Sequence, residues 1–84
     1  MLISNNYFLE NMRTFIGAIN DNETVQAFVG SIVSISETLN NQLVVYNERG
    51  IPLFVTSRIV GLNYAKNGDC SIRTQTGSCY IFSR

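Results

Sequence analysis

The sequence predicts a mainly β fold: a small, bent, five-stranded antiparallel barrel with an N-terminal helix and an extra C-terminal β-hairpin. Three observations predict it. Short apolar segments alternate with clusters of turn-forming residues along the chain. The segment around Gly30 is rich in β-branched residues, which favour strands. The chain has 84 residues, the length of one small domain, so residues 1–84 are expected to fold together.

A short amphipathic helix is expected at about residues 5–13, followed by a first strand at about 14–20. The apolar residues of the helical segment recur on one side, and Asn5 is a candidate N-cap. The apolar segment after it ends at a run of turn formers at positions 20–22. A first strand followed by a tight turn fits this pattern.

The segment 23–36 is interpreted as a long strand that bends at Gly30. Six of its residues are β-branched and lose rotamer freedom in a helix. A glycine in a helix interior also costs about 1 kcal/mol. The alternative is a helix over residues 24–39, because apolar residues recur there at helical spacing as well. That alternative describes a two-helix α+β domain.

The rest of the chain reads as further strands separated by turns. They are expected at about 39–47, 51–56, 59–66, 69–75 and 78–83. Between the third and fourth of these, Asn67-Gly68 is a strong two-residue hairpin signal and predicts a type I′ turn. Such a turn pairs Tyr64 with Ser71.

The composition excludes several classes of function. Basic and acidic residues number six each, so the net charge is zero and binding to duplex DNA is not expected. Histidine, the commonest general base and metal ligand, is absent. Cys70 and Cys79 fit no four-ligand metal pattern, and the acidic residues lie at no motif spacing. We therefore expect no metal, no cofactor and no enzymatic activity.

The hydropathy pattern bears on location and partners. No apolar run approaches the roughly 18 residues of a membrane span, and the N-terminus lacks a charged-then-apolar leader. A cytoplasmic protein without a membrane partner is the expectation.

Charged residues make up 14% of the chain, against about 25% in average globular domains. A surface with so little charge is typical of a protein that binds a partner.

The spacing between Gly30 and Asn40 resembles the first signature of the Sm, Lsm and Hfq family of ring-forming RNA-binding barrels. Five of the seven signature positions agree, and they are Gly30, Ile32, Ile35, Leu39 and Asn40. Ser36 stands where the family has an aspartate, and Thr38 where it has an aromatic residue.

Two further segments support the resemblance. Residues 7–13 look like the start of the Hfq helix. Residues 54–59 occupy the place of its second signature, although Thr56 and Ser57 replace a lysine-histidine pair. The resemblance covers residues 5 to about 64. An unrelated small β domain with similar spacing is the alternative.

The resemblance implies a homo-oligomeric ring of five to seven subunits that binds single-stranded RNA around its pore. The implied RNA-binding residues are Asn40, Arg58, Ser36, Thr38 and Asn5. Because Thr38 offers no ring on which a base can stack, and stacking contributes about 1–3 kcal/mol per base, the binding is expected to be weak. In the plainer interpretation Asn40 only forms a turn and Arg58 is a solvated charge.

In such a ring the fourth strand of one subunit pairs with the fifth strand of the next. The apolar strands at 51–55 and 59–62 carry few charges that would block this association. Tyr80 and Phe82 are predicted to lie with Arg73 on one exposed face. The interface candidates are Ile51, Leu53, Val55, Ile59, Leu62, Tyr80 and Phe82. The alternative function is a structural or protein-interaction module without nucleic-acid binding.

Overall fold

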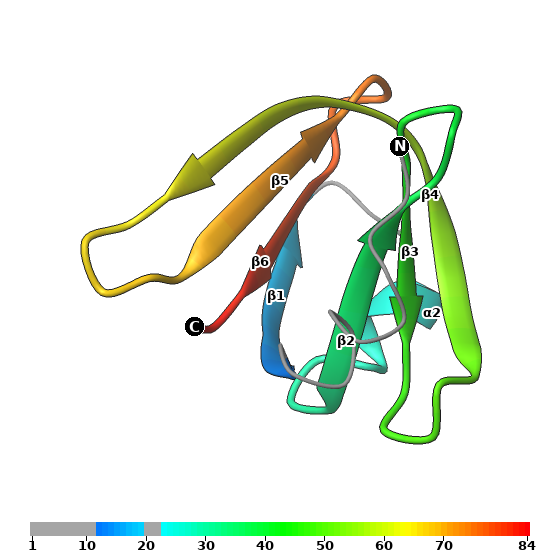
Figure 1. Ribbon diagram of the computed structural model, residues 1–84, viewed down its shortest axis with the longest axis vertical. Coiled ribbons are helices and arrows are strands. Elements are labelled where there is room, and N and C mark those ends of the chain that lie inside the picture. The colour runs from blue at the N-terminus through cyan, green and yellow to red at the C-terminus, as the bar shows by residue number, and fades with distance from the viewer. Residues whose placement is uncertain (1–11, 20–22) are drawn as a thin grey trace.

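The computed structural model describes residues 12–19 and 23–84, which form a closed antiparallel barrel of six strands (Figure 1). Each strand pairs with the next along the chain, and the last pairs with the first. The elements are β1 (Arg13–Ile19), α2 (Glu23–Gln26), β2 (Ile32–Glu37), β3 (Gln42–Tyr46), β4 (Pro52–Tyr64), β5 (Cys70–Thr74) and β6 (Cys79–Phe82). The predicted helix lies outside the described residues, except at Met12, which belongs to no element, and Arg13, which belongs to β1.

The predicted mainly β antiparallel barrel is confirmed, but the number of strands is six and not five. The C-terminal hairpin is not an addition to the barrel, because β5 and β6 form part of its wall. β5 pairs with the second half of β4, and β6 pairs with β1, where Ala18 lies opposite Tyr80. The barrel therefore closes through the first and last strands of the chain.

The two strands predicted at 51–56 and 59–66 are one strand, β4. Its first half pairs with β3 and its second half with β5, and the register shifts between Ile59 and Gly61, within the pairing with β5. The chain stays extended between the two predicted strands, because the turns on both sides hydrogen-bond to the β4 backbone at Arg58 and Ile59. The amide of Ile59 donates to a carbonyl of the β2–β3 turn at 2.6 Å, and the carbonyl of Arg58 accepts from the β5–β6 turn at 2.8 Å.

The prediction of a long strand over 23–36 is wrong, and so is the helix over 24–39. The single helical turn α2 comes first, and β2 starts only at Ile32. Gly30 lies in the turn between them with a φ of 99°, a conformation that costs an L residue about 1–2 kcal/mol. Its amide donates to the carbonyl of Phe15 at 2.7 Å, which fixes the turn against β1. The glycine therefore ends a turn and does not bend a strand.

All four hairpins of the barrel use the same three-residue loop, in which the third loop residue is left-handed. In the β3–β4 loop the amide of Gly50 donates to the carbonyl of Asn47 at 3.0 Å, and the amide of Asn47 donates to the carbonyl of Ile51 at 2.9 Å. The other three loops repeat this pair of bonds. The left-handed residues are Asn41, Gly50, Gly68 and Gly77.

The predicted two-residue turn at Asn67-Gly68 is therefore wrong by one loop residue. Tyr64 pairs with Cys70 and not with Ser71. A shift of one residue exchanges the two faces of a strand. It places Cys70 and Ile72, and not Ser71 and Arg73, on the same face of the sheet as Tyr64.

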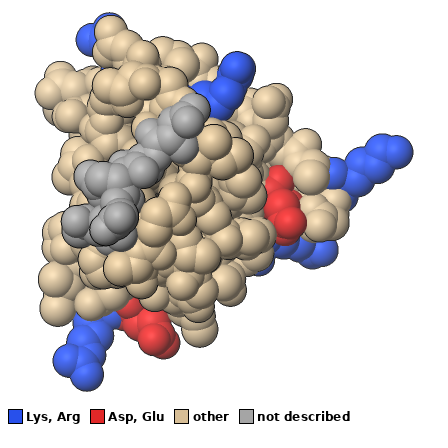
Figure 2. All heavy atoms as spheres, turned by 180° about the vertical axis from the view of Figure 1, so that it is seen from behind, with Lys and Arg blue, Asp and Glu red and all other residues tan. Residues whose placement is uncertain are grey.

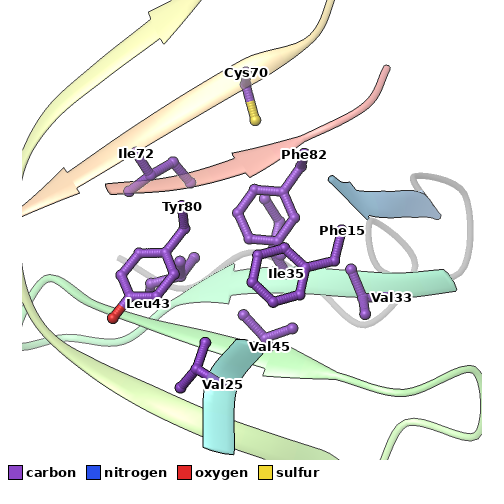
Figure 3. Packing of buried hydrophobic residues seen from close by; sticks show 10 residues of the cluster. All are labelled: Phe15, Val25, Val33, Ile35, Leu43, Val45, Cys70, Ile72, Tyr80 and Phe82. Atoms are coloured by element: carbon purple, nitrogen blue, oxygen red, sulfur yellow. The ribbon is translucent and has the colours of Figure 1, made fainter. Parts of the chain in front are cut away.

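The core is built around aromatic rings from β1 and β6 (Figure 3), against which Phe54 of β4 packs. Phe15 and Phe82 are fully buried and stack with ring centroids 5.2 Å apart. The ring of Phe54 lies 5.8 Å from Phe15 and 5.7 Å from Tyr80. Tyr80 and Phe82 thus point inward, and their predicted exposed face is wrong because they pair with the buried Ile72 and Cys70, on the face of β5 opposite to Arg73. Arg73, on the outer face of β5, is exposed as predicted.

We predict that Gly77→Ala lowers the free energy of unfolding by about 1–2 kcal/mol, because alanine is strained at a positive φ. No atom lies within 4 Å of the added Cβ, so the effect isolates the backbone. Gly17→Ala is the control, since its Cβ also meets nothing within 4 Å and its φ is not positive. Urea denaturation measures both variants, and equal stabilities contradict the prediction.

Candidate functional site

A polar hollow of about 450 Å³ lies at one end of the barrel, where three segments meet. They are the β2–β3 turn, the middle of β4 and the β5–β6 turn, seen together at the top of Figure 1. The residues that line the polar hollow are Asn40, Gln42, Ser57, Arg58 and Gln75. Two of the RNA-binding candidates named from the sequence, Asn40 and Arg58, are therefore neighbours in this site.

Backbone pairing explains why these residues converge. Gln42 at the start of β3 lies opposite Arg58 in the β3–β4 ladder. The amide of Gln75 donates to the carbonyl of Arg58 at 2.8 Å, which holds the β5–β6 turn against the middle of β4. A hydroxyl contact of 3.1 Å between Ser57 and Thr76 joins the same two segments. The floor of the polar hollow is thus fixed by hydrogen bonds on both sides.

The side chains of the polar hollow differ in how far they are already engaged. Gln42 donates from Nε2 to the carbonyl of Thr56 at 3.1 Å, which leaves its Oε1 as an acceptor. Within residues 12–19 and 23–84, the side chains of Asn40, Arg58 and Gln75 make no hydrogen bond or ion pair, and all three are exposed. The site therefore offers amide donors and acceptors beside one guanidinium group.

Two other RNA-binding candidates, Ser36 and Thr38, do not line the polar hollow. Ser36 is buried and its hydroxyl lies 3.2 Å from that of Tyr46, so it stabilises the wall of the barrel. The hydroxyl of Thr38 accepts from the amides of Asn40 at 3.2 Å and Gln42 at 3.1 Å. Thr38 therefore caps the β2–β3 turn and shapes the loop that carries Asn40. Asn5 lies outside the described residues.

Sequence reasoning missed Gln42, Ser57 and Gln75. Ser57 adjoins Arg58 in the sequence, and Gln75 starts the loop that ends at Gly77, so loop position is the only signal that marks Gln75. Their meeting depends on long-range strand pairing, which local patterns do not specify.

The interface candidates divide by exposure. Ile51, Val55 and Leu62 are each about half exposed, at 54%, 55% and 53%. Leu53 and Ile59 are partly buried against the core. Tyr80 and Phe82, being buried, contribute nothing to the surface of the described barrel. Of the interface candidates, the first three therefore present the most apolar surface to a partner.

Charged side chains are scattered at the margins of the face shown in Figure 2, and most of that face carries no charge. In the part of the chain that the structure describes, no group of three His, Cys, Asp or Glu side chains is arranged to hold a metal ion. The same residues include no helix long and apolar enough to cross a membrane.

Comparison with protein-family models, curated proteins and solved structures gave no match.

The two cysteines lie in different environments. Cys70 is buried opposite Phe82, whereas Cys79 is half-buried opposite Arg73, and both are free thiols. Burial raises the pKa of the Cys70 thiol; Arg13 partly offsets this rise and Asp69 adds to it. The thiol therefore resists ionisation in the folded state.

We predict that stability falls as the pH rises above about 8.5, the ordinary pKa of a cysteine. The folded-state pKa of Cys70 is raised, so above that pH the unfolded chain releases this proton more readily and the folded state loses its advantage. Urea denaturation from pH 7.5 to 9.5 measures the slope. Cys70→Ala removes this part of the slope, whereas Cys79→Ala retains it. Equal slopes in the two variants contradict the assignment.

Proposed function

We propose that this protein is an Sm-like, homo-oligomeric ring protein of five to seven subunits that binds single-stranded RNA weakly through the polar hollow. One observation carries the proposal: Asn40 and Arg58, far apart in the sequence, line the same hollow together with two glutamines. Under this proposal the protein binds RNA and is not an enzyme.

The chemistry of the polar hollow suits an unpaired nucleotide. The amides of Asn40 and Gln75 each present a donor and an acceptor to the Watson–Crick edge of a base. The guanidinium group of Arg58 reaches a phosphate or stacks on a base. Duplex nucleic acid is a poor ligand, because its base edges are paired and its affinity depends on many basic contacts.

The affinity is expected to be low for two reasons. No aromatic side chain lines the polar hollow, so the stacking contribution of about 1–3 kcal/mol per base is missing. Arg58 is also the only basic residue that lines the hollow. With one basic contact for each subunit, a ring gains affinity mainly by engaging one RNA at several subunits.

We predict that short U-rich or A-rich RNA binds weakly at low salt and still more weakly at physiological salt, as fluorescence anisotropy measures. Arg58→Gln lowers the affinity about fivefold and reduces the salt slope by about 0.7 for each lost phosphate contact. Asn40→Ala lowers the affinity with little change in the salt slope, because it removes an uncharged contact. Arg49→Gln, in the β3–β4 loop and outside the polar hollow, is the matched control.

Flat anisotropy curves at both salt concentrations contradict the RNA-binding part of the proposal. Equal losses in Arg58→Gln and Arg49→Gln contradict the assignment to the polar hollow, because they indicate binding by diffuse charge.

The ring is supported by the apolar surface of β4. Its first half pairs only with β3 and its second half only with β5 among the described residues, so each half has a second edge without a described strand partner. Val55 and Leu62 add exposed apolar side chains to these halves. Exposed strand edges with apolar side chains associate unless another chain covers them.

We predict a native mass of five to seven subunits by light scattering. Val55→Lys lowers this mass, because it places a desolvated charge in the contact. Glu48→Lys, in the exposed β3–β4 loop, leaves the mass unchanged. A wild-type monomer at all concentrations contradicts the ring.

The second candidate function is a structural or protein-interaction module that binds no nucleic acid. The missing aromatic platform and the half-exposed Ile51, Val55 and Leu62 favour it. This function is supported if the oligomer forms while RNA does not bind.

A further inference from the structure

A second cavity, of about 100 Å³, opens into the barrel beside β4 and lies apart from the polar hollow. Ile35, Leu43, Ile72 and Cys70 form its interior, and all four are buried. Its lining contains Ser36 and Glu37 but no other strongly polar group apart from the hydroxyl of Tyr64. We refer to it as the inner cavity.

The mouth of the inner cavity is formed by the second half of β4. Leu62 lies opposite Ile72, and Tyr64 lies opposite Cys70, so these side chains project from the same face of the sheet as the buried core. Leu62 is nevertheless 53% exposed and Tyr64 61% exposed. The inner face of β4 therefore continues past the closed part of the barrel into solvent.

Glu37 places one carboxylate at this cavity. It pairs with Leu43 across β2 and β3, and directly paired residues project to the same face, so its side chain lies on the side of the inner cavity. Glu37 is half-buried and has no ion pair among the residues that the structure describes. A carboxylate and the exposed ring of Tyr64 both attract a cation.

The volume limits the ligand. Ligands of drug size need about 300–1,000 Å³, and an apolar cavity of about 150 Å³ accepts benzene. A volume of about 100 Å³ is therefore suited to a branched aliphatic group. The apolar interior formed by Ile35, Leu43 and Ile72 favours such a group over water, because water needs polar partners.

We propose that the inner cavity binds a small primary amine, with its branched aliphatic group among Ile35, Leu43 and Ile72 and its ammonium group at Glu37 and Tyr64. This inference is independent of RNA binding, because none of these residues lines the polar hollow.

Three probes that share an isobutyl group test the proposal. They are the cation isobutylammonium, the neutral 2-methyl-1-propanol and the anion isovalerate. Methyl NMR of the full chain is expected to show saturable shifts at Ile35, Leu43 and Ile72. The ammonium probe is expected to bind about fivefold more tightly than the alcohol, and isovalerate less tightly than both.

Glu37→Gln is expected to remove most of the preference for ammonium over alcohol, while Glu48→Gln, in the β3–β4 loop, preserves the fivefold preference. Because both variants lose one negative charge, the comparison separates a contact at the inner cavity from the net charge of the protein. Absence of saturable shifts with the ammonium probe in the wild-type chain overturns the proposal. A fivefold preference for the cation that is unchanged in Glu37→Gln overturns the assigned ammonium site.

Discussion

The pairing of β1 with β6 is the constraint on which the rest of the structure depends. It joins the first and last strands of the described chain and carries Phe15 and Phe82 into contact, with ring centroids 5.2 Å apart. Each buried phenylalanine contributes roughly 1.5–3 kcal/mol by leaving water. A barrel of this size has little other apolar area to bury, so an open sheet would lose the centre of its core.

Strand pairing also places the polar hollow. The β5–β6 turn reaches the middle of β4 because Thr74 pairs with Ile59 in the β4–β5 ladder, and Gln75 follows directly in that turn. From the other side, the β2–β3 turn brings Asn40 to the same region, and the left-handed Asn41 shapes that loop. The site is therefore a consequence of how the hairpins meet, and its residues come from three separate turns and strands.

The sequence allowed the strand content and most turn positions to be predicted, because glycine and asparagine mark each left-handed loop residue. Asn40 and Arg58 were singled out from a resemblance in spacing, and the two residues line the same hollow. The register around Asn67-Gly68 could not be predicted, since two- and three-residue loops share this dipeptide. Gly30 was misread for a similar reason: a positive φ in a turn and a bend in a strand both require glycine. The face of Tyr80 and Phe82 could not be predicted either, because it depends on the pairing of β6 with β5 and β1, which local patterns do not specify.

Native-state hydrogen exchange along the β1–β6 ladder tests the closed barrel most directly. Closure predicts that amides bonded between β1 and β6 exchange only through global unfolding, with the same denaturant dependence as the amides of β3. Exchange of the β1–β6 amides by local opening, far faster than that of β3 and insensitive to denaturant, would show that the first and last strands are not joined and would contradict this account.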